Sequence, residues 1–113
     1  MITLVITPNP IWTLGNEDGD SKILTFNEFS TVEENIEKVK QHLKEFNSFT
    51  SNQEVLIYIF QVLVKQKDIG YEDVAIHYYT HPNRYTIISF NEDGLLSEDS
   101  IKTLSVELLM RLI

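Results

Sequence analysis

Residues 73–90, DVAIHYYTHPNRYTIISF, contain the only dense group of chemically versatile side chains in this sequence. Histidine can transfer protons near neutral pH, and arginine can hold an oxyanion through two parallel hydrogen bonds. Tyrosine adds a hydroxyl group and a flat ring for stacking. A surface that combines them could bind a phosphate, a nucleobase or a loop of another protein. The candidate residues are His77, Tyr79, His81, Arg84 and Tyr85, with Tyr78 beside them.

Two strands and a tight turn would position this group. Residues 73–80 and 84–90 have the alternation of strands, and His81-Pro82-Asn83 between them favours a turn. Alternation places His77 and Tyr79 on one face, and Tyr85 joins that face in one of the two registers of the return strand. The opposite face is expected to be core and carries Val74, Ile76 and Tyr78. Three interpretations stay open: an ordinary half-exposed hairpin, a protein contact, or a site for a small ligand or for catalysis.

Metal binding is not predicted. The spacing of His77 and His81 spans a strand end and a turn, so the two rings would not share a face. The run Asn16–Asp20 copies the alternating start of a calcium-binding EF-hand loop. However, Ser21 stands where that loop needs glycine, and Asn27 stands where it needs a bidentate glutamate.

Catalytic and cofactor-binding motifs are also missing. The sequence lacks the G-x-x-x-x-G-K-[ST], G-x-G-x-x-G and G-x-S-x-G patterns. Cysteine is absent, which excludes disulfides, thiolate nucleophiles and cysteine-ligated zinc. We therefore predict no catalytic residue, no metal and no cofactor, and we interpret the protein as a non-enzyme.

The remaining sequence predicts the elements that carry the hairpin. Alternating β-branched residues predict a strand at 2–7, and a second strand at 22–29 would pair with it as a hairpin. Residues 11–14 could resume the first strand at an edge, and residues 47–50 are interpreted as a break. The run at 55–64 is apolar nearly all round, so a buried helix is favoured over a buried strand.

Capping residues indicate where helices begin. Ser30 with Glu33, or Thr31 with Glu34, can form a capping box for the first helix. One face of that helix would be apolar, namely Val32, Ile36, Val39, Leu43 and Phe46. Ser51 with Glu54 could open the second helix. Ser97 could cap a third, whose apolar stripe would be Ile101, Leu104, Leu108 and Leu112.

The predicted order is β-β-α-α-β-β-α, which indicates an α+β fold with helices packed on one face of a sheet. We expect a four-stranded antiparallel sheet, with a mixed sheet as the alternative, and three helices. The length of 113 residues fits one compact domain that spans residues 1–113.

The charge of the chain is unevenly distributed. The net charge is −8, and residues 1–37 alone carry seven acidic residues against one lysine. Such a surface repels nucleic acid and anionic membranes and attracts basic partners. The N-terminus has no basic segment before its apolar run, which argues against a signal peptide, and no apolar run is long enough to span a bilayer. We therefore expect a cytoplasmic protein that binds neither nucleic acid nor membrane.

These observations favour a small acidic interaction protein, of the inhibitor, immunity or adaptor type, that docks on a basic surface of a protein partner. A narrower version is a mimic of nucleic acid. The acidic first third, from Glu17, Asp18 and Asp20 to Glu33, Glu34 and Glu37, would steer association. Trp12 or the hairpin tyrosines Tyr78, Tyr79 and Tyr85 would anchor it. The first alternative is a ligand-binding domain or enzyme centred on residues 77–85. The second is a structural homo-oligomer that shares an open sheet edge or the apolar helix at 55–64.

Overall fold

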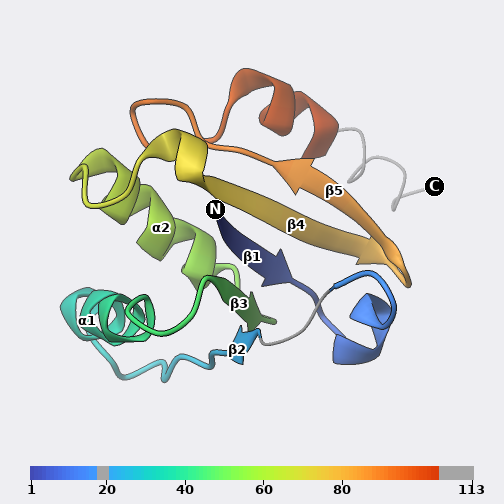
Figure 1. Cartoon of the computed structure of the whole chain (residues 1–113), viewed down its shortest axis with the longest axis horizontal. Helices are drawn as coiled ribbons and strands as arrows, with labels where there is room; N and C mark the ends of the chain where they lie inside the picture. The colour runs from blue at the N-terminus through green and yellow to red at the C-terminus, as the bar shows by residue number, and fades with distance from the viewer. Residues whose placement is uncertain (18–20, 105–113) are drawn as a thin grey trace.

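The computed structural model describes residues 1–17 and 21–104 (Figure 1). Five strands form one sheet in the order β2-β3-β1-β4-β5. Strand β1 (Ile2–Ile6) lies at the centre, parallel to both β3 (Ser48–Ser51) and β4 (Val74–His81). Strand β2 (Lys22–Ile23) is parallel to β3, and β5 (Arg84–Ile88) is antiparallel to β4.

The α+β class is confirmed, and helices α1, α2 and the helix at 98–104 give the expected three. The sheet is mixed and has five strands, so the preferred prediction of four antiparallel strands was wrong. Helix α1 (Val32–His42) connects β2 to β3, and α2 (Val55–Lys65) connects β3 to β4. Each helix returns the chain to the same end of the sheet, which allows its flanking strands to run parallel.

Strand β3 was missed because its sequence, SFTS, gives little signal. Residues 47–50 were predicted to be a break, but Phe49 and Ser51 are buried while Ser48 and Thr50 lie on the other face. Because β3 lies between β1 and β2, the predicted hairpin of the first two strands was also wrong. A strand of four residues gains its stability from neighbours on both sides, and these are distant in sequence.

The predicted strand at 22–29 forms ladder pairs only at Lys22–Ile23. Beyond it the chain stays extended, with Leu24 N–H donating to the Thr50 carbonyl at 2.8 Å. The side chain of Gln53 then replaces a neighbouring strand. Its Oε1 accepts from Phe26 N–H at 2.7 Å, and its Nε2 donates to the Phe26 carbonyl at 3.1 Å. Sequence alternation alone could not distinguish this side-chain pairing from a ladder.

The predicted edge segment at 11–14 is instead the 3-10 helix η1 (Pro10–Thr13). Proline at the first helical position fits a missing N–H donor, and Asn9 caps the turn by accepting from Ile11 N–H at 3.0 Å. A short second 3-10 helix, η2 (Tyr71–Asp73), leads into β4.

Helix α1 begins as predicted at Thr31, whose hydroxyl accepts from Glu34 N–H at 3.1 Å. Most of its predicted apolar face packs on the core, but Val32 is exposed at the first turn. The helix at 55–64 is confirmed as α2, although Glu54 stands in the cap position without a side-chain cap and Ser51 belongs to β3. The predicted capping box there was therefore wrong.

Ser97 caps the helix at 98–104 by accepting from Ser100 N–H at 3.2 Å. Of its predicted apolar stripe, Leu104 packs against the core and Ile101 is exposed. Leu108 and Leu112 lie outside the described residues.

The core lies between α1, α2 and one face of the sheet. Leu4, Ile76 and Ile88 project from three adjacent strands toward Phe60 of α2 and Val39 of α1, and all five are fully buried. The opposite sheet face carries His77 and Tyr79, together with Val5 opposite His77. In the described part of the chain, no helix has the length and apolarity needed to cross a bilayer.

Candidate functional site

Three of the candidate binding residues, namely Glu17, His77 and Tyr79, meet on the sheet face opposite α1 and α2. Glu17 Oε1 accepts a hydrogen bond from the Tyr79 hydroxyl at 2.8 Å and lies 2.8 Å from His77 Nδ1. The side chains of His77 and Glu17 are 20% and 18% exposed, while Tyr79 is only 1% exposed. One carboxylate oxygen therefore connects β4 to the loop that follows η1.

Tyr85 completes the cluster from β5. The register of the hairpin sets Tyr85 opposite Tyr79, so the predicted register that adds Tyr85 to the second face is the correct one. Its ring stacks on His77 with centroids 4.3 Å apart and an interplanar angle of 16°. It also contacts the Tyr79 ring at a centroid distance of 5.2 Å. Tyr85 contacts the face of the His77 ring, whereas Glu17 contacts its Nδ1 atom. The two contacts together restrict the orientation of the ring.

Two further hydrogen bonds bring η1 and the loop that follows it to the turn of the hairpin. Asn83 N–H donates to the Trp12 carbonyl at 2.9 Å, and Asn16 Nδ2 donates to the Asn83 carbonyl at 2.8 Å. Asn83 has φ of 59°, a left-handed conformation that asparagine tolerates in turns. We call the contacts of Trp12, Asn16 and Glu17 with the hairpin the loop clasp. Trp12 acts here through its backbone, and its side chain is partly buried.

The electrostatics of the clasp favour a neutral Tyr79. Burial, followed by the hydrogen bond to Glu17 and the charge of its carboxylate, raises the pKa of the Tyr79 hydroxyl above its ordinary value. A histidine held at Nδ1 by a carboxylate is also the arrangement of an oriented general base. Here, however, the carboxylate is shared with a buried tyrosine, which gives the cluster a clear structural role.

The other predicted site residues do not join this cluster. His81 Nδ1 lies 3.0 Å from the hydroxyl of its neighbour Thr80, beyond a register shift between Tyr79 and His81. Arg84 is exposed at the start of β5. Asp18 and Asp20 lie outside the described residues. Among the described residues, no group of three or more His, Cys, Asp or Glu side chains could hold a metal ion.

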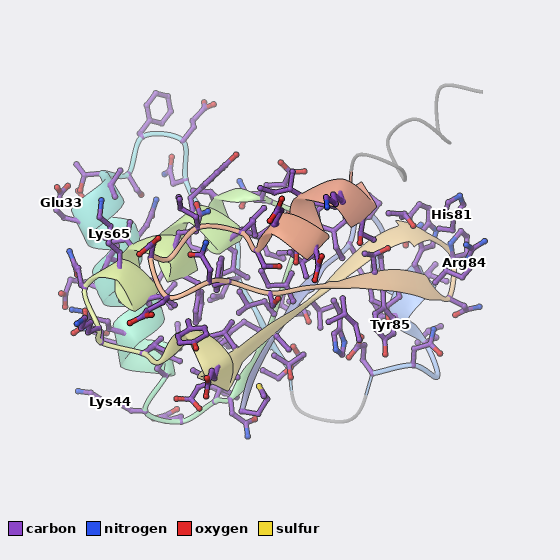
Figure 2. All side chains as sticks on the ribbon, turned by 90° about the horizontal axis from the view of Figure 1, so that it is seen from above. Glu33, Lys44, Lys65, His81, Arg84 and Tyr85 are labelled. Atoms are coloured by element: carbon purple, nitrogen blue, oxygen red, sulfur yellow. The ribbon has the colours of Figure 1, made fainter. Side chains whose placement is uncertain are left out.

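A second surface lies at the other end of the molecule. The sequence had indicated its carboxylates Glu33, Glu34 and Glu37 as steering charges, but not its exposed apolar residues. Figure 2 shows Glu33 at one end and His81, Arg84 and Tyr85 at the opposite end. Phe29, in the turn before α1, is 85% exposed, and Val32 beside it is also exposed. Both are flanked in the sequence by exposed carboxylates. We call this surface the Phe29 patch, and it consists of Glu28, Phe29, Val32, Glu33, Glu34 and Glu37.

The turn that presents Phe29 is well held. Asn27 Oδ1 accepts from Phe29 N–H at 2.8 Å, and the Asn27 carbonyl accepts from Ser30 N–H at 3.0 Å. One step earlier, Gln53 pairs with the backbone of Phe26. Lys38 Nζ donates to the Thr25 carbonyl at 2.6 Å and lies 5.4 Å from the centroid of the Phe26 ring. Phe29 is therefore exposed on an ordered support.

The carboxylates of the patch have few partners of their own. Across residues 1–17 and 21–104, the ion pairs are Lys40 with Asp68 and His77 with Glu17, and neither involves the patch. Glu33 and Glu34 lie in the first turn of α1, where the helix dipole favours negative charge. Glu33, Glu34 and Glu37 line a shallow hollow of about 470 Å³ with Lys38 and Gln41. The patch thus combines exposed carboxylates with two exposed apolar side chains.

Other cavities lie elsewhere on the molecule, and Tyr79 of the cluster lines the smallest of those described here. An open groove of about 710 Å³ runs between α2 and the loop at 91–95, where Tyr58, Lys65 and Leu95 line it. Two smaller hollows, of about 170 and 140 Å³, flank Pro8 at the carboxyl ends of β1 and β3. In the smaller one the Tyr78 hydroxyl donates to Glu54.

Comparisons with protein-family models, characterised proteins and solved structures found no significant match to this sequence.

Proposed function

We propose that this protein is a small acidic interaction domain without catalytic activity, and that it docks through the Phe29 patch on a basic surface of a protein partner. The observation that carries the proposal is the 85% exposure of Phe29 on a turn held by Asn27 and Gln53. An exposed aromatic side chain on a rigid support is the usual form of an interface anchor.

The energy of such an anchor is substantial. Burying a phenylalanine side chain contributes about 1.5–3 kcal/mol. The turn at 27–31 is already ordered by its own hydrogen bonds, so little further entropy is lost when a partner binds. Val32 would extend the apolar contact from the first turn of α1.

The surrounding carboxylates would supply direction and specificity. They are exposed and unpaired with described basic side chains, so their field reaches solvent. A partner of opposite charge would be steered toward the patch, and the effect should decrease as salt screens it. Inhibitors, immunity proteins, adaptors and mimics of nucleic acid are all forms of this function.

The proposed contact residues differ from those that the sequence indicated. Trp12, Tyr79 and Glu17 were expected to contact the partner. The side chains of Tyr79 and Glu17 take part in the loop clasp, and Trp12 joins it through its backbone carbonyl. The Phe29 patch lies in the same acidic first third of the chain, so the expected basic partner is retained while the contact residues change.

A second candidate function is a small-ligand site or enzyme centred on the hairpin. The observation that favours it is His77, whose ring is oriented by Glu17 and Tyr85 and remains partly accessible. It has less support, because His81 and Arg84 lie outside the cluster and leave His77 without a second polar group from the hairpin turn.

The test is a comparative capture from the native host with three baits: the wild type, Phe29→Ala and His77→Ala. A fourth bait, Tyr58→Ala, is the matched control, because Tyr58 is an exposed aromatic residue on α2. The proposal expects one protein that the wild type and Tyr58→Ala retain and Phe29→Ala loses. Retention by Phe29→Ala with loss by His77→Ala would favour the hairpin site instead.

A further inference from the structure

The outer edge of β5 is a second feature that calls for a partner, independent of the Phe29 patch. Strand β5 is an edge strand of the sheet, and its other side pairs with β4. Figure 1 shows β5 at the end of the sheet opposite to β2, β3 and α1. An open edge can add another strand through its unpaired N–H and C=O groups.

The direction of these groups follows from Ser89, one residue after β5 ends. Ser89 N–H donates to Ser100 Oγ at 2.9 Å, and the Ser89 carbonyl accepts from Ser97 N–H at 2.9 Å. Both backbone groups of Ser89 therefore point away from β4. Because alternate residues of a strand direct their backbone groups to the same edge, those of Ile87 and Tyr85 also point outward.

Within residues 1–17 and 21–104, no backbone group pairs with this part of the edge. The backbone hydrogen bonds outside the strands reach Asn83 on one side of it and Ser89 on the other. The stretch that no other described residue pairs with is therefore 84–88, and its outward donors and acceptors belong to Tyr85 and Ile87.

The helix at 98–104 borders this edge at Ser89, but β5 itself carries few of the features that usually protect an edge strand. The sequence of β5, RYTII, contains no lysine, proline or bulge. Ile87 is 63% exposed, and Tyr85 beside it on the same face is partly exposed. The opposite edge, β2, is protected in two ways, because it is only two residues long and contains Lys22.

We infer that β5 is a self-association surface, at which a second copy of this protein adds its own β5 in antiparallel orientation. In this arrangement Tyr85 of one copy faces Ile87 of the other. By two-fold symmetry, Ile87 of the first copy also faces Tyr85 of the second. Each of these two pairs would exchange two backbone hydrogen bonds, which gives four in all. An aromatic side chain next to a β-branched one is a favourable cross-strand pair, and two-fold symmetry provides it twice.

Charge supports a second copy despite the net charge of −8. The only charged residue in β5 is Arg84, which would face Ile88 of the other copy, so no like charges oppose each other in the ladder. The acidic Phe29 patch lies at the far end of each molecule and would point away from the contact (Figure 2). A ladder of this length buries less than a standard interface, so we expect a weak dimer with a dissociation constant in the micromolar range or above.

The test is sedimentation equilibrium of the wild type, Ile87→Lys and Ile87→Pro from micromolar to near-millimolar protein. The lysine adds charge at an exposed position. The proline removes only an outward N–H, so the β4–β5 ladder is preserved. Ile23→Lys is the matched control, because Ile23 is an exposed isoleucine on the opposite edge strand.

We expect a dimer for the wild type and Ile23→Lys, and a dissociation constant at least about tenfold higher for both Ile87 variants. Amide exchange should slow for Tyr85 and Ile87, but not for Thr86, as wild-type concentration rises. A protein that stays monomeric throughout the range would overturn the inference. A dimer that both Ile87 variants form as well as the wild type would overturn it too.

Discussion

The carboxylate of Glu17 and the hydroxyl of Tyr79 are joined by a 2.8 Å hydrogen bond, although the two residues lie 62 positions apart in the chain. The same oxygen of Glu17 also meets His77. This pairing holds the segment from Pro8 to Glu17 against the sheet face. It also gives the buried Tyr79 hydroxyl a hydrogen-bond acceptor.

Replacement of Glu17 by alanine should lower the free energy of unfolding by about 1–3 kcal/mol, because the buried Tyr79 hydroxyl would lose its acceptor. Glu17→Gln should lose less, since the amide oxygen can still accept. Urea unfolding of Glu17→Ala, Tyr79→Phe and the double variant measures the coupling. Additive losses in the double variant would mean that the two side chains do not interact.

His77→Ala should lower the free energy of unfolding by about 1–2 kcal/mol, because it removes both the contact with Glu17 and the stack on Tyr85. His81→Ala is the matched control and should change stability by less than about 0.5 kcal/mol. Equal melting temperatures for the wild type and both variants would contradict this role of His77.

The raised pKa of Tyr79 predicts a loss of stability in alkali. An unfolded tyrosine ionises near a pKa of about 10, whereas folded Tyr79 keeps its proton to higher pH. The folded protein therefore retains a proton that the unfolded chain loses at high pH. The contribution of Tyr79 to the free energy of unfolding is complete below a pH of about 10 and decreases as pH rises above it. The decline should be steeper in the wild type than in Tyr79→Phe when urea midpoints are followed into alkali. Parallel curves would show that Tyr79 ionises alike in both states.

Gln53→Ala should lower the free energy of unfolding by about 1–3 kcal/mol, because the N–H and C=O of Phe26 lose their partners. It should also weaken capture of the partner, since the support of Phe29 becomes less ordered. Gln41→Ala is the control, as Gln41 is a glutamine on α1 that lines the shallow hollow beside the patch. Unchanged stability of Gln53→Ala would show that the extended segment does not need this clamp.

Gly94→Ala should destabilise the protein more than Gly15→Ala. Both glycines have positive φ, of 81° and 83°, so alanine is strained at either position. At Gly94, a Cβ atom would also lie 2.6 Å from the Gln61 carbonyl oxygen, whereas the space at Gly15 is open. We expect losses of about 2–4 kcal/mol at Gly94 and about 1 kcal/mol at Gly15. Similar unfolding midpoints for the two variants would be inconsistent with close packing of the loop on α2.

The sequence allowed prediction of the elements whose signals are local. The alternation of Val74, Ile76 and Tyr78 predicted β4, the run at 55–64 predicted α2, and Thr31 marked the start of α1. The sheet order could not be predicted, because Ser48–Ser51 is too short and polar to show its two neighbours.

The site was predicted in part. His77, Tyr79 and Tyr85 were expected on one face and do lie together, but their partner Glu17 was assigned to the acidic surface. The register that connects Glu17 to β4 depends on the path of the loop over the sheet, which no spacing in the sequence encodes. Phe29 was missed because the sequence placed it at the end of the predicted strand at 22–29, and only the three-dimensional structure shows it exposed in a turn.

The most direct test of the central claim is the association and dissociation kinetics of the captured partner, measured at low and high salt. The account predicts that Phe29→Ala speeds dissociation at both salt concentrations. Joint replacement of Glu33, Glu34 and Glu37 by glutamine should slow association strongly at low salt and little at high salt. Association independent of salt, together with unchanged dissociation of Phe29→Ala, would contradict docking through the Phe29 patch.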